Sequence, residues 1–340
     1  MSNSIQKPPE NMTLAELLQT WPILRDFFEN LRLSSLDLSL PPEDAILGLH
    51  PDMLADFELT PMEVYDQFLL FFDHFTTSDE GIGDIQTLTL IGGNDKSGCP
   101  EECRLEVSPG EVISIVGPTG SGKSRLLEDI ECLAQGDTPT GRRILLNHAP
   151  VPDEIRFGTQ HRLVAQLTQN MNFVMDLTVR DFLEMHARCR LRPDTKAQID
   201  ACFDCAIRLS GEPFDLDTKV TQLSGGQSRA LMIADTACIS NSPIILVDEI
   251  ENAGINRHEA IRLLAKEGRI VFLSTHDPVL ALNASRRIVI KNGGISGILR
   301  TTEEERAGLA IIEQMDTVLH CVRDDLRRGE RITVRDMHIQ

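Results

Sequence analysis

The fold of this chain is decided by the stretch Gly117-Pro118-Thr119-Gly120-Ser121-Gly122-Lys123-Ser124. It lies between the apolar run 112–116 and the amphipathic run 125–130, so the sequence predicts a strand, a glycine-rich loop and a helix in that order. Such a loop turns successive backbone N–H groups toward one anion, and the N-terminus of the following helix adds partial positive charge. We therefore expect all eight residues to form a phosphate-binding loop, in which Lys123 reaches the β- and γ-phosphates of a nucleotide and the Ser124 hydroxyl ligates Mg²⁺.

The composition narrows the class of protein. With 340 residues, of which 41% are hydrophobic and 25% charged, the chain is expected to be globular and to hold about two domains. A formal net charge of −19 argues against nucleic-acid binding, because neutralising phosphates requires clustered Lys and Arg. No window approaches the roughly 18 apolar residues of a membrane span. We expect a cytoplasmic protein without direct membrane insertion, which reaches the inner membrane only through partner subunits that supply the spans.

Residues 1–78 are predicted to form a small helical domain. Two capping boxes, TLAE at 13–16 and TPME at 60–63, each predict a helix start. Behind the second box, helical spacing predicts one buried face made of Met62, Tyr65, Phe68, Leu69 and Phe72. The polar, glycine-bearing residues 79–84 are the expected linker.

From residue 85 to residue 300 the pattern is that of an α/β domain. The continuous apolar runs 244–247 and 270–273 are typical of strands that are covered on both faces, and residues 170–240 are predicted to be mainly helical. Residues 301–340 are expected to form a C-terminal amphipathic helix and a tail. The apolar positions of that helix favour docking on its own domain over binding a partner: Leu309, Ile312, Met315, Leu319, Val322 and Leu326.

Two downstream motifs define the class of the phosphate-binding loop. They are Leu223-Ser224-Gly225-Gly226-Gln227, and Leu246-Val247-Asp248-Glu249 at the end of an apolar strand. With these motifs in this order, the sequence resembles the ATP-binding cassette (ABC) ATPases from about residue 85 to residue 295. The resemblance implies a P-loop NTPase core with a mixed β-sheet, flanking helices and a helical subdomain, and it implies ATP sandwiched between two subunits.

The acidic pair has two expected roles. Asp248 would hold Mg²⁺, directly or through water, and Glu249 beside it can polarise the attacking water. The resemblance implies that Ser224, Gly225, Gly226 and Gln227 of one subunit contact the γ-phosphate bound by the other. It also makes His276 the switch histidine that contacts the γ-phosphate.

The resemblance makes Gln169 the glutamine that ligates Mg²⁺ or water and connects the core to the helical subdomain. Gln160 and Gln166 are competing candidates for this role.

Three features depart from the family pattern. No aromatic residue stands near Ile91, where the family usually stacks one on adenine. Residues 251–256 replace the usual loop after the catalytic acid, which puts communication between subunits through that loop in doubt. Two cysteine pairs, Cys99 with Cys103 and Cys202 with Cys205, leave a metal or redox role open beside the simpler interpretation as buried thiols.

These observations predict an ATP hydrolase whose cofactors are ATP and Mg²⁺ and which drives conformational change in a partner. The simplest interpretation is the ATP-binding subunit of an ABC transporter, assembled with a second ABC subunit and with membrane permease subunits. One alternative is a soluble ATPase that activates a metalloenzyme or matures a metallocofactor, because residues 17–22 resemble small helical domains of iron–sulfur-related proteins. A non-catalytic ATP sensor is a third hypothesis.

Overall fold

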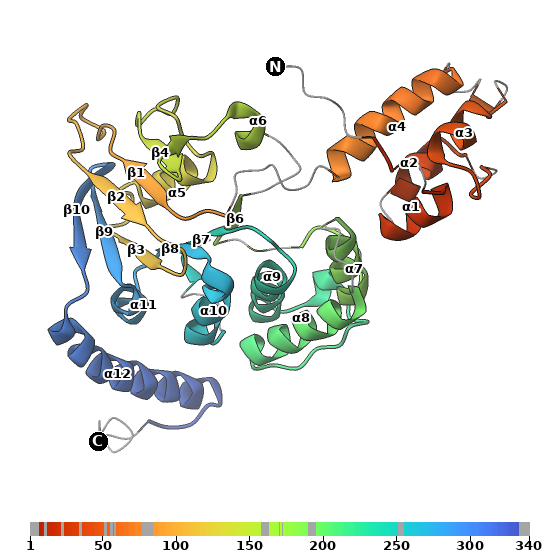
Figure 1. Cartoon of the computed structure of the whole chain (residues 1–340). Coiled ribbons are helices and arrows are strands. Elements are labelled where there is room, and N and C mark those ends of the chain that lie inside the picture. The colour runs from red at the N-terminus through yellow and green to blue at the C-terminus, as the bar shows by residue number, and fades with distance from the viewer. Residues whose placement is uncertain are drawn as a thin grey trace. The chain divides into compact units, whose positions relative to one another are not determined.

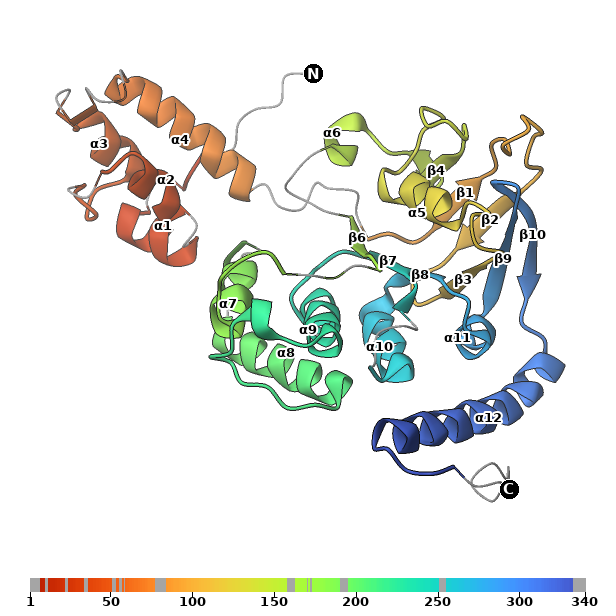
Figure 2. The same ribbon diagram turned by 180° about the vertical axis from the view of Figure 1, so that it is seen from behind.

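The computed structural model describes residues 7–9, 12–21, 24–33, 36–50, 53–54, 57, 59–76, 84–157, 163–169, 171, 173–189, 195–250 and 255–332. The chain divides into two compact units, Met1–Gly83 and Asp84–Gln340, and each is described by itself. Figures 1 and 2 show the ribbon from opposite sides. The expected linker, residues 79–84, lies outside the described residues except for Asp84.

The first unit is helical, with α1 (Leu14–Thr20), α2 (Leu24–Asn30), α3 (Pro42–Leu47) and α4 (Pro61–Thr76). Both capping boxes are confirmed. The Thr13 side chain accepts from the Glu16 amide and Glu16 accepts from the Thr13 amide, and Thr60 and Glu63 make the same pair of bonds. Aromatic rings of α2 and α4 form the core, with Phe27 and Phe28 each packed against Phe68.

The predicted buried face of α4 is correct at Tyr65, Phe68, Leu69 and Phe72 but wrong at Met62. Met62 is 59% exposed, whereas Val64 is fully buried. Met62 lies in the first turn of α4, directly after Pro61.

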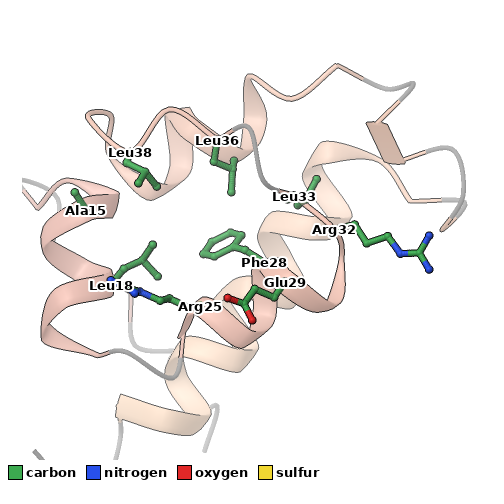
Figure 3. Close-up of a pocket in the computed structure, with 9 residues that line it drawn as sticks. All are labelled: Ala15, Leu18, Arg25, Phe28, Glu29, Arg32, Leu33, Leu36 and Leu38. Carbon is green, nitrogen blue, oxygen red and sulfur yellow. The ribbon is translucent and has the colours of Figure 1, made fainter.

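A cavity of about 590 Å³ lies within the first unit. Figure 3 shows Leu18 of α1 and Phe28 of α2 beside Leu36 and Leu38 of the segment that follows α2. The remaining lining residues are Ala15, Arg25, Glu29, Arg32 and Leu33. The cavity is therefore mainly apolar, and its charged residues come from α2 and from the turn after it.

The second unit has the predicted α/β fold with a mixed β-sheet, and it contains an antiparallel sheet as well. A four-stranded antiparallel sheet has the order β2-β1-β4-β5. Its strands are β1 (Leu88–Ile91), β2 (Arg104–Val107), β4 (Arg143–Leu146) and β5 (Ala149–Pro150). The two sheets are separate because β1 pairs with β2 on one side and with β4 on the other, and not with β3, the strand before the glycine loop.

The six-stranded sheet has the order β10-β9-β3-β8-β7-β6 and carries the candidate site. All its neighbouring strands are parallel except β10, which is antiparallel to β9. The strands are β3 (Val112–Val116), β6 (Val164–Leu167), β7 (Ile244–Asp248), β8 (Ile270–Ser274), β9 (Arg286–Lys291) and β10 (Gly294–Arg300). Residues 244–247 of β7 and the whole of β8 are buried, as predicted from their apolar runs.

Helices cover this sheet and extend beyond it. Those of the core are α5 (Lys123–Glu131), α6 (Asp153–Arg156), α10 (Arg257–Leu264) and α11 (Pro278–Asn283). Beside them, α7 (Val179–Cys189), α8 (Thr195–Ser210) and α9 (Gly225–Cys238) pack together in one apolar cluster, and α12 (Glu303–Arg327) follows β10 (Figure 1). Within the described part of the chain, no helix combines the length and the apolar character that crossing a membrane requires.

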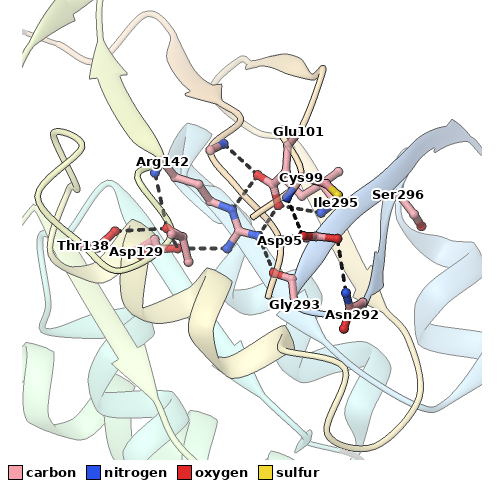
Figure 4. A network of polar contacts seen from close by, with 12 residues as sticks. Asp95, Cys99, Glu101, Asp129, Thr138, Arg142, Asn292, Gly293, Ile295 and Ser296 are labelled. Carbon is pink, nitrogen blue, oxygen red and sulfur yellow. Dashed lines mark hydrogen bonds and ion pairs between the residues drawn. The ribbon is translucent and has the colours of Figure 1, made fainter. Parts of the chain in front are cut away.

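A buried ion-pair network ties the start of the second unit to its end (Figure 4). Arg142 is fully buried, and its guanidinium donates to the carboxylate of Glu101 (Nε–Oε2 2.9 Å), to Asp129 of α5 (Nη1–Oδ2 2.9 Å) and to the Gly293 carbonyl (2.8 Å). Glu101 also accepts from the amides of Gly93 and Ile295. The helix that follows the glycine loop is thus joined to segments far from it in sequence.

Candidate nucleotide-binding site

Four neighbouring parallel strands bring the candidate residues to one edge of the six-stranded sheet. The glycine loop follows β3, and Thr275-His276 follow β8. Asp248 is the last residue of β7 and Glu249 follows it, whereas Gln169 comes two residues after β6. Because the carboxyl ends of parallel strands lie at the same edge, segments that are distant in sequence meet there. This edge is where open α/β sheets bind their ligands.

The glycines of the loop are needed where the backbone approaches other segments closely. Gly122, the residue before α5, has φ +108°, and a Cβ there would lie 2.9 Å from the Cα of Gly293. A Cβ on Gly117 would lie 2.5 Å from the carbonyl oxygen of Ile290. The loop between β3 and α5 is therefore packed against the β9–β10 hairpin, and larger residues would displace it.

Lys123 is buried at the start of α5 and points back across the loop. Its ammonium lies 3.2 Å from the Gly117 carbonyl and 2.9 Å from Nε2 of His276. An ammonium has only donors, so Nε2 of His276 accepts this bond as a neutral imidazole. The two candidate γ-phosphate contacts thus lie side by side, although 153 positions separate them in the sequence.

Glu249 lies in contact with two other predicted residues. Its Oε2 accepts from the Gln169 amide at 2.9 Å, and its Oε1 lies 3.3 Å from His276 Nε2. Its backbone has φ +49°, in the left-handed region that is costly for a residue with a side chain, and its amide donates to the Ser274 carbonyl at 3.0 Å. Such backbone strain is concentrated at functional sites.

Asp248 and Ser124 lie next to each other. Ser124 Oγ is 3.5 Å from Asp248 Oδ2. Both are hard oxygen donors, and Mg²⁺ prefers carboxylate and hydroxyl oxygens beside phosphate oxygens. The donor set therefore fits Mg²⁺, with Ser124 and Asp248 as the residues that would hold it.

Gln166 and Gln169 are placed differently, whereas Gln160 lies outside the described residues. Gln166 lies within β6, and its amide, oriented to satisfy its neighbours, donates to the Glu131 carboxylate at 2.8 and 3.1 Å. Gln169 contacts Glu249 instead. The geometry therefore favours Gln169 over Gln166 as the glutamine of the site.

Ser224, Gly225, Gly226 and Gln227 form the start of α9 as a capping box. The Ser224 hydroxyl oxygen accepts from the Gln227 amide at 3.3 Å, and the Ser224 amide donates to the Gln227 side chain at 2.9 Å. The Gln227 amide group also donates to the Pro213 carbonyl. The structure thus gives Ser224 a structural role, and it places these four residues at a helix N-terminus.

Lys96 is a residue of the site that sequence reasoning missed. It belongs to the loop after β1, where the family's aromatic is absent, and its ammonium donates to the Gly120 carbonyl at 3.2 Å. The loop is folded on Asp95, which accepts from the Ser97 and Cys99 amides, and the Lys96 amide donates to the Asn292 carbonyl. No local sequence signal marks Lys96, because its contact depends on how this loop folds.

The eight cysteines are free. On α8, Cys202 is buried and Cys205 is half-buried. The thiols of both form hydrogen bonds with Cys238 of α9. These hydrogen bonds, together with the charges of Arg269 and Lys266, outweigh burial and hold the pKa of Cys238 below its ordinary value. Across the residues that the structure describes, no group of three or more His, Cys, Asp or Glu has an arrangement able to hold a metal ion. Residues 251–254 of the loop after Glu249 lie outside the described residues.

Comparison with known proteins matches this chain to ATP-binding proteins of ABC transporters. Residues 101–252 match the ABC transporter family. The chain is 51% identical over 259 residues to the uncharacterized ABC transporter ATP-binding protein MJ0121 of Methanocaldococcus jannaschii, a match that covers 75% of this chain and 98% of that protein. It is 32% identical over 201 residues to the macrolide export ATP-binding/permease protein MacB of Brucella abortus, covering 56% of this chain but only 30% of MacB.

Solved structures show the same fold. The dimeric ATP-binding cassette MJ0796, in a post-hydrolysis state with ADP and Pi, matches with TM-score 0.50 and 26% identity, covering 63% of this chain and 99% of that one. The ATP-binding subunit of an ABC transporter matches with TM-score 0.51 and 18% identity, and the match covers 66% of this chain and 94% of that one. The second likeness concerns the fold alone.

Proposed function

This chain belongs to the family of ABC transporter ATP-binding proteins, and from that premise we propose that it binds and hydrolyses MgATP and passes the conformational change to a partner. One observation carries the proposal. Lys123, His276, Glu249 and Gln169, from four segments of the chain, are joined by contacts of 2.9, 3.3 and 2.9 Å at the carboxyl edge of the sheet.

Binding would fall to the glycine loop and Lys123. The backbone N–H groups of the loop and the N-terminus of α5 attract an anion, and Lys123 adds a full charge. Its present partners, the Gly117 carbonyl and neutral His276, are weaker acceptors than phosphate oxygens, so a triphosphate would draw the ammonium away from them. Mg²⁺, held by Ser124 and Asp248, would neutralise part of the phosphate charge when bound.

Glu249 is the proposed proton acceptor for the attacking water. The Gln169 amide donates to one carboxylate oxygen and so holds the side chain in place. His276 Nε2 can accept from Lys123 or donate to Glu249, but one nitrogen cannot do both at once. When Lys123 moves to the phosphates, this nitrogen becomes able to carry a proton toward the γ-phosphate.

We propose that the site is completed by a second ABC subunit. The Ser224 oxygen accepts a bond inside its own helix turn, which leaves the hydroxyl proton for an acceptor outside that turn. The γ-phosphate bound by the other subunit is the proposed acceptor. The further partner is proposed to be a membrane permease, which would place this chain in the cytoplasm at the membrane. Co-purification from the native source asks whether the partner carries transmembrane helices. A soluble metalloprotein as the partner would favour the alternative role.

The experiment is nucleotide titration and phosphate release with two variants. Lys123→Ala should abolish or greatly weaken ATP binding, because it removes the charge in the loop. Glu249→Gln should bind ATP like the wild type but lose turnover about 10²–10⁴-fold, because an amide cannot take up the proton. The control is Glu128→Gln, an exposed acid on α5 that pairs with Arg125. Near-normal hydrolysis by Glu249→Gln would show that another group activates the water.

A further inference from the structure

Three of the free cysteines lie together where α8 packs on α9 (Figures 1 and 2). Cys202 and Cys205 are one turn apart on α8, and Cys238 is the last residue of α9. Both α8 thiols form hydrogen bonds with the Cys238 thiol, and all three side chains belong to one apolar cluster. The sequence leaves a redox role open for the α8 pair, and the structure adds a third thiol to it.

The three thiols differ in how far solvent reaches them. Cys202 is fully buried, whereas Cys205 and Cys238 are both partly exposed. A small reagent can therefore reach Cys205 and Cys238, while Cys202 lies behind them in the core.

Positive charge surrounds the two accessible thiols. The Arg208 guanidinium donates to Cys205 Sγ at 3.0 Å and lies 3.5 Å from the Glu259 carboxylate. The buried Arg269 guanidinium donates to three backbone carbonyls around the end of α9, beside Cys238. A helix C-terminus disfavours an anion, and Arg269 offsets this by binding those carbonyls. Guanidinium groups placed in this way favour a thiolate.

The same contacts give the three thiols different pKa values. The hydrogen bonds from Cys202 and Cys205, with the charges of Arg269 and Lys266, outweigh burial and lower the pKa of Cys238 from 9.0 to about 7. The hydrogen bond with Cys238 and burial raise the pKa of Cys202, and burial is the largest cause that raises the pKa of Cys205. At neutral pH the thiolate of this cluster is therefore on Cys238.

We propose that Cys238 and Cys205 form a reversible disulfide between α9 and α8 by exchange with a low-molecular-weight disulfide such as glutathione disulfide. The Cys238 thiolate attacks one sulfur of the reagent, whose S–S bond breaks and releases one glutathione thiolate. Cys205 then attacks the Cys238 sulfur of the mixed disulfide, and its proton goes to the second glutathione as that leaves. Two protein thiols are oxidised while one external disulfide is reduced to two thiols.

Cys205, rather than Cys202, is the proposed partner for an electrostatic reason. The negative charge of the Cys238 thiolate raises the pKa of Cys205, and Arg208 lowers it. Once Cys238 is bonded to glutathione its charge is gone, whereas Arg208 remains in contact with Cys205. The exchange needs no nucleotide, so this site goes beyond the proposed function and does not depend on it.

The first test is the rate at which iodoacetamide alkylates each cysteine of the reduced wild type at neutral pH, followed by mass spectrometry of peptides. The matched control is Cys132, which is also partly exposed but has its pKa raised by burial. Cys238 should react at least roughly fivefold faster, because its larger thiolate fraction outweighs the lower nucleophilicity of a more acidic thiol. Equal rates at the two cysteines would overturn the proposal.

The second test is equilibration of the full chain with reduced and oxidised glutathione in the absence of oxygen. The peptides of Cys205 and Cys238 should become linked, and excess reduced glutathione should separate them again. The background carries serine at the exposed cysteines, to prevent links between chains: Cys99, Cys189 and Cys321.

Two variants identify the partner of Cys238. Cys205→Ser should stop at the mixed disulfide, with glutathione on Cys238, whereas Cys202→Ala should still form the internal disulfide. Alkylation of the remaining free thiol in the wild type gives the same answer without any variant. Circular dichroism checks that both variants fold, and unchanged ATP binding separates this site from the nucleotide site.

Two results would contradict the assignment. A link from Cys238 to Cys202 in the wild type would make the buried cysteine the partner. Glutathione that stays on Cys238 of the wild type, with no internal disulfide, would show that α8 and α9 hold the sulfurs apart.

Discussion

His276 has two neighbours that compete for one nitrogen of its ring. Its Nε2 lies between the Lys123 ammonium and the Glu249 carboxylate, which require opposite roles of that nitrogen. The conflict is resolved only when one neighbour leaves, and a bound triphosphate would draw away Lys123 because its oxygens are the stronger acceptors. In the proposed function, the same residue would connect nucleotide binding to the group that activates water.

Lys96→Met should weaken nucleotide binding between about twofold and tenfold. The hydrogen bond from Lys96 to the Gly120 carbonyl stabilises the loop by roughly 0.5–1.5 kcal/mol. Without this bond the loop must be ordered when the nucleotide binds, and the free energy of that ordering weakens binding. Titration with a fluorescent ATP analogue measures the effect. Lys196→Met, which removes an exposed charge from α8, is the control, and equal affinities of the two variants would contradict the role of Lys96.

The structure brings the predicted site residues together where a motif directly follows a strand. Asp248, Glu249 and His276 could be placed together because parallel buried strands end at one edge. Lys96 and Arg142 could not be placed, since their partners are set by loop folding and by contacts between distant segments. The separate antiparallel sheet was missed for a similar reason, because the pairing of β1 with β4 is not visible in either strand alone.

At the scale of secondary structure, α9 depends on one serine for its start. Ser224→Ala should destabilise the first turn of α9 by about 1 kcal/mol, because the Gln227 amide loses its acceptor. Hydrogen exchange at the Gln227 amide should become several-fold faster, since 1.4 kcal/mol corresponds to roughly a factor of ten.

Ser224→Thr keeps a capping hydroxyl and should exchange like the wild type. If Ser224→Ala also exchanged at the wild-type rate, the capping box would not be what holds this turn. Hydrolysis measured on the same three proteins shows whether turnover needs the hydroxyl at position 224, because only the alanine variant lacks it.

At the scale of the whole second unit, the ion-pair network around Arg142 stabilises the fold, because it joins segments that are distant in the sequence. Both oxygens of Glu101 accept from N–H donors, so Glu101→Gln would turn an NH₂ group toward two of them and leave Arg142 paired with Asp129 alone. Breaking a buried ion pair in this way costs about 3–5 kcal/mol. Thermal unfolding measures this loss of stability. The control is Glu106→Gln, which breaks the exposed ion pair with Arg104 and should change stability little.

Acid should remove the same stabilisation from the wild type. Burial raises the pKa of Glu101, but the hydrogen bonds from Arg142 and from the Gly93 and Ile295 amides outweigh it and hold that pKa below the ordinary 4.5. The contribution of Glu101 to the free energy of unfolding is therefore complete above pH 4.5, and it is lost as the pH falls through the lowered pKa of Glu101 in the folded state. The difference in stability between wild type and Glu101→Gln should therefore shrink as the pH is lowered. A difference that stayed constant would show that groups other than the Glu101 carboxylate cause it.

The same network sets the order in which the working protein can be completed during synthesis. The Ile295 amide reaches Glu101 across 194 positions, and the Gly293 carbonyl reaches Arg142 across 151. Contacts of such long range form late, because the chain between them must first be ordered. A nascent chain that already carries the glycine loop still lacks the hairpin against which Gly117 and Gly122 pack, so the loop cannot reach its final packing before Gly293 has left the ribosome.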